Sequence, residues 1–348
     1  MQIIYSALHN LDLNQEMPIR KTIPTDFNSY MDAYIKFATT ENDSSREYTP
    51  IDANRTVLRC VSTIFSDVLS QGTAVTDVKP LNEQSDSIAK KLLDVEKEVQ
   101  DRIGQMTDVQ KGSIVQAFIS DDEGYKYIIA KVEHSEWYDG ETLIKNFGFP
   151  GKNKRVWKCS VIGLDVIDGE IIFPSIKAYI NTNAKYWTTS FLEINEAKTD
   201  AQNTKAVLHA VEKVLRPVKE KSPQDYYNLR NTALHELQSE QLINYPDMVD
   251  RLLTNYHPSS DDVNVQSIKG KLLDATGFDS QFHTDPKSIK GAGKIKIYVS
   301  PAIDVLVKEG ISNWREDFLI HEKRDGRTFL MIRCDDPTTI RSFPKDME

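Results

Sequence analysis

The sequence lacks the features that define secreted, membrane-spanning and zinc-binding proteins. It has three cysteines in 348 residues, and Cys60, Cys159 and Cys334 are too far apart to form a Cys-x-x-Cys pair. This spacing supports neither a disulfide framework nor a zinc site, and favours thiols that pack as small apolar side chains. No apolar run approaches the length that spans a bilayer, and the N-terminus lacks the pattern of a secretory signal. We therefore expect a cytoplasmic protein with no membrane association.

Catalytic motifs are also missing. The seven histidines are scattered without metal-ligand spacing, and no Gly-x-Ser-x-Gly nucleophile motif occurs. One pattern with enzymatic chemistry is Glu196-Ala197-Lys198, with Asp165 or Asp168 upstream, because acids that hold Mg²⁺ beside a lysine can cleave phosphodiesters. Such a triplet is expected by chance in a chain this rich in both residues. We therefore predict no enzyme activity, no catalytic residue, no metal and no cofactor.

The chain has more acidic than basic residues. With 43 basic and 52 acidic residues, the formal net charge is −9. A nucleic-acid partner requires basic surface, because phosphate contacts are driven by the release of condensed cations. Net charge does not exclude such a partner, since a local patch decides the contact. A DNA-binding role must therefore depend on basic residues that are gathered in particular segments.

The first half of the chain predicts helices followed by an antiparallel sheet. Apolar residues recur at helical spacing from Asp52 to Leu69 and from Ser85 to Met106, after a loop-like stretch at residues 41–50. From Gly112 the period becomes that of strands. The predicted strands are 114–120, 125–132, 155–164 and 170–173, with turns at Asp121–Gly124 and Asp168-Gly169. These elements define a first domain, residues 1–180.

The second half predicts a helical segment and a smaller sheet. Thr199 or Asp200 is placed to cap a central helix, and Pro217 is expected to end it. Further helices are predicted over 222–237, 246–256 and 263–275, then a short helix near 301–308 and a hairpin of 318–322 with 328–333. These elements define a second domain, residues 181–348. The fold class is α+β.

The central helix carries a resemblance to a known family. Asp200 to Leu215 reads DAQNTKAVLHAVEKVL, which resembles the central motif of bacterial nucleoid-associated proteins of the NdpA/YejK type. Ile114–Val132, the aromatic-rich Tyr179–Leu192 and the glycine-rich entry GAGKIKIYV resemble other parts of that family in the same order. The similar patches are scattered over residues 110–348, while the N-terminal region and the acidic charge depart from it. The resemblance implies association with the bacterial nucleoid and with double-stranded DNA.

Two basic loops are the main candidates for contact with DNA. Residues 145–158, KNFGFPGKNKRVWK, interleave five basic side chains with aromatic ones that can stack on bases. Residues 285–299, DPKSIKGAGKIKIYV, place lysines around glycines whose backbone N–H groups can cradle phosphate, although no Walker motif follows. An ordinary solvated loop is the alternative for each. The predicted nucleic-acid-binding residues are Lys145, Lys152, Lys154, Arg155 and Lys158; Lys287, Lys290, Lys294 and Lys296; Lys185 and Lys205 from the family-like stretch; and Arg324 and Arg327 from the terminal hairpin.

The predicted function is that of a nucleoid-associated protein that binds the phosphate backbone largely without regard to base sequence. One alternative is a non-catalytic adaptor in a DNA-processing or phage-defence complex, because the acidic remainder of the surface suits a basic protein partner. The other alternative is the Mg²⁺-dependent nuclease that Glu196 and Lys198 suggest. A homodimer is compatible with the apolar stripes of the two N-terminal helices.

Overall fold

The computed structural model describes residues 1–23, 32, 36, 45–72, 75–104, 112–138, 145–148, 158–180, 184–307, 318–322 and 326–342. They form an α+β protein, as predicted, and divide into two compact units. The first unit comprises residues 1–203, 242–246 and 278–283, and the second comprises 204–241, 247–277 and 284–348. The sequence predicts a division at residue 180. The first unit instead keeps the start of the central helix and includes two short segments from later in the chain.

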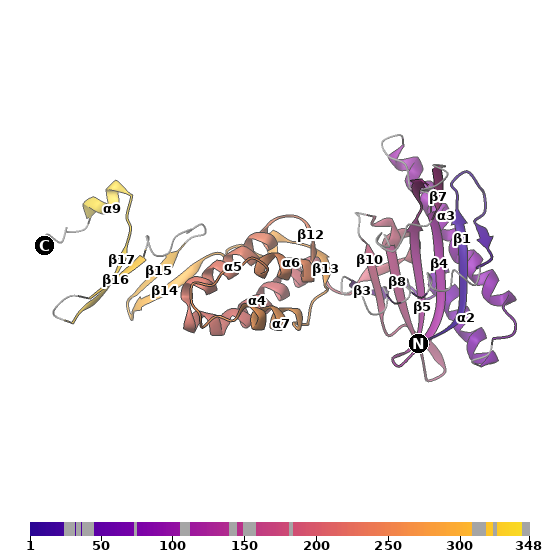
Figure 1. Cartoon of the computed structure of the whole chain (residues 1–348), viewed down its shortest axis with the longest axis horizontal. Helices are drawn as coiled ribbons and strands as arrows, with labels where there is room; N and C mark the ends of the chain where they lie inside the picture. The colour runs from indigo at the N-terminus through magenta and orange to yellow at the C-terminus, as the bar shows by residue number, and fades with distance from the viewer. Residues whose placement is uncertain are drawn as a thin grey trace. The chain divides into compact units, whose positions relative to one another are not determined.

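An antiparallel sheet is the main element of the first unit (Figure 1). In the part of the chain that the structure describes, nine strands form this sheet in the order β11-β3-β10-β8-β5-β4-β1-β2, with β9 paired to β8. The strands are β1 (Gln2–Leu11), β2 (Ile19–Lys21), β3 (Arg46–Pro50), β4 (Gly112–Asp121), β5 (Gly124–Glu133), β8 (Lys158–Ile167), β9 (Glu170–Ile172), β10 (Ile176–Ile180) and β11 (Ile194–Glu196). A separate pair joins β6 (Ser135–Tyr138) to β7 (Lys145–Gly148).

Two hairpin turns of this sheet follow the predicted chemistry. Gly124 has a φ of 115° at the turn between β4 and β5. Asp168 and Gly169, with φ of 52° and 83°, connect β8 to β9. A two-residue hairpin needs left-handed backbone at both central positions in order to match the twist of its strands, and Asp-Gly supplies it at little cost.

Strand β3 lies where the sequence predicts a loop. Tyr48 is in register with Ile176 of β10 on one side and with Glu196 of β11 on the other. Arg46 and Tyr48 are buried. The backbone groups of this segment find their partners in strands that are distant in sequence, which local polarity cannot reveal.

Two helices pack against the sheet. α2 (Thr56–Gln71) and α3 (Lys79–Ile103) bury their apolar stripes in one core with side chains of the strands. Val61 and Ile64 of α2 and Ile88 and Leu92 of α3 are fully buried, and each such burial stabilises the fold by about 1.5–3 kcal/mol. Because the same chain covers these stripes, they do not provide the homodimer surface considered above.

The long helix α4 (Asp200–Lys221) begins as predicted but ends later. Gln202 N donates to Thr199 Oγ1 at 3.2 Å, and Thr199 N donates to Gln202 Oε1 at 2.8 Å, so the two residues cap the helix reciprocally. Pro217 does not end α4. Leu215 and Val218 on either side of the proline are buried, and their packing outweighs the one hydrogen bond that the proline removes.

The remaining elements follow α4. They are α5 (Pro223–Gln238), β12 (Leu242–Asn244), α6 (Tyr245–Leu253), α7 (Val265–Leu273), β13 (Gln281–His283), the short η4 (Pro286–Ile289), β14 (Ile295–Ser300), β15 (Ile303–Val307), β16 (Phe318–Glu322), β17 (Thr328–Ile332) and α9 (Pro337–Ser342). Ser222 caps α5 by accepting from Asp225 N, as predicted. The predicted short helix near 301–308 is wrong, because the β-branched residues of β15 pair with β14 instead.

Candidate nucleic-acid interface

α4 presents a line of basic side chains on one exposed face. This line, which we call the α4 stripe, consists of Lys205, His209, Lys213 and Arg216. Successive members are three or four residues apart, about one helical turn, so they lie on one side of the helix. On the other side Val207, Val211 and Leu215 are buried. The stripe is therefore the solvent face of an amphipathic helix.

The nearest acid in sequence does not neutralise the stripe. Glu212 is bound by Arg230 of α5, whose Nε and Nη2 donate to Glu212 Oε1 at 2.9 and 2.7 Å. Within the described ranges, Lys205, Lys213 and Arg216 form no ion pair. Glu220, one turn beyond Arg216, is exposed and marks the end of the basic line. Three cations of the stripe are therefore available to an anionic ligand.

The glycine-rich segment lies against the same pair of helices. At one end, Asp285 N donates to Thr204 Oγ1 of α4 at 2.9 Å. At the other end, Arg230 Nη2 donates to the Ala292 carbonyl at 2.6 Å. The lysines of this segment are exposed, and among the residues with a described placement they form no ion pair; they are Lys287, Lys290 and Lys294. Because Thr204 precedes Lys205, this lysine segment begins beside the start of the α4 stripe.

The other predicted basic residues have different surroundings. Lys185 is exposed just before η3 (Trp187–Leu192) in the first unit, and Arg327 is exposed with its guanidinium 5.9 Å from the centre of the Phe329 ring. Lys158 is only 3% exposed, and its Nζ lies 5.6 Å from the centre of the Tyr186 ring. It is therefore not part of an exposed basic surface, contrary to our expectation, because its strand directs it inward.

Part of the first basic loop lies outside the described residues. This applies to Lys152, Lys154 and Arg155, and also to Arg324 of the terminal hairpin. For Lys145 and Lys296 the structure describes the strand but not the side chain. The contribution of this loop to DNA binding stays a prediction from the sequence.

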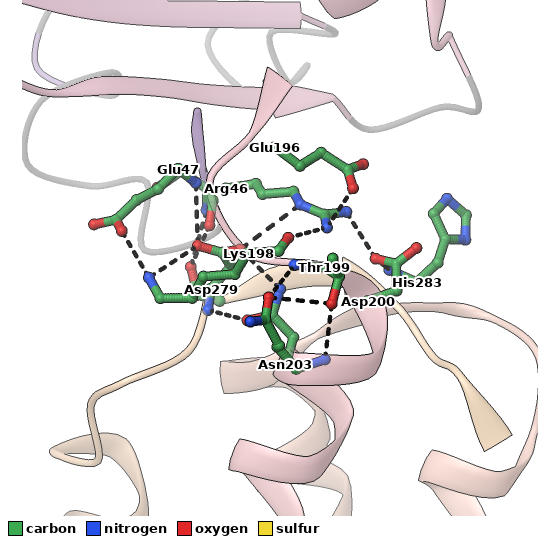
Figure 2. A network of polar contacts seen from close by, with 12 residues as sticks. Arg46, Glu47, Glu196, Lys198, Thr199, Asp200, Asn203, Asp279 and His283 are labelled. Carbon is green, nitrogen blue, oxygen red and sulfur yellow. Dashed lines mark hydrogen bonds and ion pairs between the residues drawn. The ribbon is translucent and has the colours of Figure 1, made fainter. Parts of the chain in front are cut away.

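The family-like stretch also takes part in a buried polar network (Figure 2). Arg46 of β3 is 5% exposed and donates from Nη2 to Glu196 Oε2 and from Nη1 to Asp200 Oδ1, each at 2.8 Å. Arg46 Nη2 also donates to the Lys198 carbonyl at 2.7 Å. A buried guanidinium needs such partners, because an unpaired charge in the interior is costly. The network thereby connects β3, β11 and the first turn of α4.

The nuclease-like triplet belongs to this network. Lys198 Nζ lies 2.7 Å from Glu47 Oε2 and 3.7 Å from Asp279 Oδ1. Partial burial raises the pKa of Glu196, an effect that Arg46 opposes. The hydrogen bond from Lys198 lowers the pKa of Glu47. No three His, Cys, Asp or Glu side chains in the described ranges are grouped so that they could hold a metal ion. The contacts of Glu196 and Lys198 in this structure join secondary-structure elements.

Of the α4 stripe, only Lys205 is among the residues predicted from the sequence to bind nucleic acid. The helical period that identifies Val207 and Val211 as buried also places Lys213 and Arg216 on the opposite face. This signal is present in the sequence, but it lies on a helix and not in a basic loop. The sequence does not show that Lys213 and Arg216 form no ion pair, because Glu212 is only one residue from Lys213.

No family model matches the chain, and no curated protein matches it. The resemblance to nucleoid-associated proteins therefore depends on the residues quoted above.

Of the helices that the structure describes, none has both the length and the apolar character needed to cross a membrane.

Proposed function

We propose that this chain is a DNA-binding protein that contacts phosphates through the α4 stripe and the lysines of residues 287–294. The observation that carries this proposal is the line of exposed cations on α4 that no described acid neutralises. From Lys205 to Arg216 an α-helix rises about 16 Å. One strand of B-DNA presents a phosphate about every 3.4 Å along its axis. The stripe is thus long enough to contact more than one phosphate of the same strand.

The distribution of charge between the units supports the same assignment. The second unit contains 21 basic and 21 acidic residues, whereas the first contains 22 basic and 31 acidic residues. The net charge of −9 therefore belongs entirely to the first unit. A neutral unit with a basic face can approach a polyanion, but a strongly acidic one is repelled. This meets the requirement for a local basic surface in an acidic chain.

Binding is proposed to depend little on base sequence. The contacts invoked are to phosphates, and these position a protein on DNA without reading its bases. The resemblance of Asp200–Leu215 to nucleoid-associated proteins supports double-stranded DNA of the nucleoid as the target. An adaptor role in a larger complex remains the alternative if the purified chain does not bind DNA.

Fluorescence anisotropy of a labelled duplex across a salt series tests the proposal. We expect the affinity of the wild-type protein to fall steeply with salt. Lys213→Ala with Arg216→Ala should weaken binding and reduce the log–log salt slope by about 2, close to one unit per lost phosphate contact. The control, Lys269→Ala with Lys271→Ala, removes two positive charges from α7 of the same unit, one of them paired with Asp250, and should bind as the wild type does. Absence of binding at low salt would exclude direct DNA binding.

The same assay separates the other predictions. The triple variant Lys152→Ala, Lys154→Ala, Arg155→Ala tests the first basic loop, and a larger loss of affinity than in the α4 double variant would move the main contact to that loop. Addition of Mg²⁺ tests the nuclease alternative. Shortening of the probe only with Mg²⁺, and its loss in Glu196→Ala or Lys198→Ala, would replace the binding proposal with a nuclease.

A further inference from the structure

The C-terminal hairpins leave many apolar side chains uncovered. Twenty large apolar side chains are exposed in the described part of the chain, and ten of them lie between residues 298 and 340. These residues belong to the hairpins β14–β15 and β16–β17 and to α9. Single exposed apolar residues are normal on a protein surface, but a concentration of this kind marks a contact site.

The β16–β17 hairpin, drawn near the C-terminus in Figure 1, is apolar on both faces. Leu319 is in register with Met331, and Ile320 is in register with Leu330. Because successive residues of a strand point to opposite faces, these two pairs lie on opposite sides of the hairpin. Leu319, Ile320 and Met331 are 52%, 66% and 50% exposed. Strands that are apolar on both faces are typical of sheets covered on both sides.

Within the described residues, this hairpin buries none of its side chains. After Val307, no side chain is buried among the residues whose burial is described. An isolated two-stranded hairpin is at best marginally stable in water, because it buries too little apolar area to offset the ordering of its backbone. In the strands that the structure describes, β16 and β17 pair only with each other, so their outer edges also offer hydrogen-bonding groups. The hairpin therefore needs a further surface.

We propose that β14–β15 and β16–β17 form a self-association surface, covered by the same hairpins of a second copy of this chain. Nine exposed apolar side chains belong to these four strands. If each exposes about half of roughly 150 Å², they leave on the order of 700 Å² uncovered. This area equals about one partner's share of a standard protein–protein interface. The inference does not depend on DNA binding.

Two observations favour a second copy as the occupant. The four strands of these hairpins carry one basic and two acidic residues, so two copies of this surface repel each other little. The hairpin is apolar on both faces, so it is complementary to itself in a two-fold contact. A hairpin that buries no described side chain needs a partner, and another copy is present wherever the chain is made.

Sedimentation equilibrium of the full chain tests this proposal. The wild type is expected at twice 39.7 kDa. Leu319→Glu should raise the dissociation constant at least about 100-fold, because it places an unpaired carboxylate in an apolar contact. Ile167→Glu is the matched control and should stay dimeric, since Ile167 at the end of β8 is also 52% exposed. Leu319 is not buried within one chain, so circular dichroism should show both variants folded.

Cys334 supplies a second measurement. Cys60 and Cys159 are buried and Cys334 is exposed just after β17, so a nitroxide label reacts at Cys334 alone. Pulsed electron paramagnetic resonance should then show a defined distance between labels of two copies in the wild type, and Leu319→Glu should abolish it. A wild type that sediments at 39.7 kDa at every concentration, or a Leu319→Glu variant that keeps twice this mass, would overturn the proposal.

Discussion

Asn203 and Asp279 are joined by two reciprocal hydrogen bonds across 76 residues of sequence. Asn203 Nδ2 donates to Asp279 Oδ2 at 2.8 Å, and Asp279 N donates back to Asn203 Oδ1 at 2.9 Å. Both residues are buried, and Asp279 Oδ1 also accepts from Glu47 N at 3.1 Å. This arrangement attaches residues 278–283 to the first turn of α4. It explains how a segment from late in the chain belongs to the first unit.

Removal of the Asn203 side chain should weaken this attachment. We expect Asn203→Ala to lower the free energy of unfolding by about 2 kcal/mol, because it leaves the buried Asp279 N–H without a hydrogen-bond partner and Asp279 Oδ2 with only the Arg46 guanidinium 3.6 Å away. Asn203→Asp should cost more, since it brings a second carboxylate to Asp279. Urea unfolding measures both variants. The control Gln202→Ala removes an exposed cap and should cost only about 0.5–1 kcal/mol. Equal losses in Asn203→Ala and Gln202→Ala would contradict the assigned role of Asn203.

His9 should make stability depend on pH. Its Nε2 lies 2.7 Å from Asp86 Oδ1, and its buried Nδ1 has no hydrogen-bond partner among the described residues. Burial lowers the pKa of His9 below 6.5, the hydrogen bond to Asp86 opposes this shift, and Arg20 adds to it. Between the folded pKa and 6.5 the unfolded chain binds more protons. The stability that depends on neutral His9 is therefore fully present above about pH 6.5, and it is lost as the pH falls toward the pKa of His9 in the folded protein.

The variant His9→Gln should flatten this dependence. Urea unfolding at several values between about pH 7 and pH 5 would show a smaller loss of stability in His9→Gln than in the wild type. Some dependence should remain, because burial and Lys131 also lower the pKa of His134. His235→Gln, at an exposed position of α5, should keep the full wild-type dependence. A profile of His9→Gln that parallels the wild type would refute the assignment.

Lys131 and Glu96 form a buried ion pair in the first unit. Lys131 Nζ lies 2.5 Å from Glu96 Oε1, both side chains are almost fully buried, and Tyr186 Oη donates to the same oxygen at 2.9 Å. Lys131→Met alone should lower the free energy of unfolding by about 3–5 kcal/mol, because it leaves an uncompensated buried charge. Lys131→Met with Glu96→Leu should recover most of this loss, since apolar side chains of similar volume can replace a buried pair.

A double-mutant cycle measures the coupling of this pair. The free energies of unfolding of the wild type, the two single variants and the double variant come from urea titrations. Lys90→Met is the control, because the Lys90–Asp94 pair on α3 is half-exposed and should contribute well under about 1 kcal/mol. If the losses of the two single variants simply add in the double variant, Lys131 and Glu96 are not coupled.

Elements with strong local signals could be predicted from the sequence. Apolar residues at helical spacing identify α2 and α3, and the period of two identifies β4 and β5. The turn at Asp168-Gly169 can be predicted because it needs a left-handed backbone conformation, which Asp and Gly adopt more easily than most residues. The β16–β17 hairpin was predicted on the same basis. In each case the information lies within a few residues of the element.

The sequence by itself determined the α+β class, the turns and the basic character of α4 and of residues 287–294, because period, turn chemistry and charge are local properties. Only the tertiary structure decided that residues 46–50 form a strand, that α4 continues past Pro217 and that Lys158 is buried. It also decided that Arg230 binds Glu212, which leaves Lys213 and Arg216 available. These outcomes depend on burial and on partners far away in sequence, and the free energies of such contacts outweigh local preference.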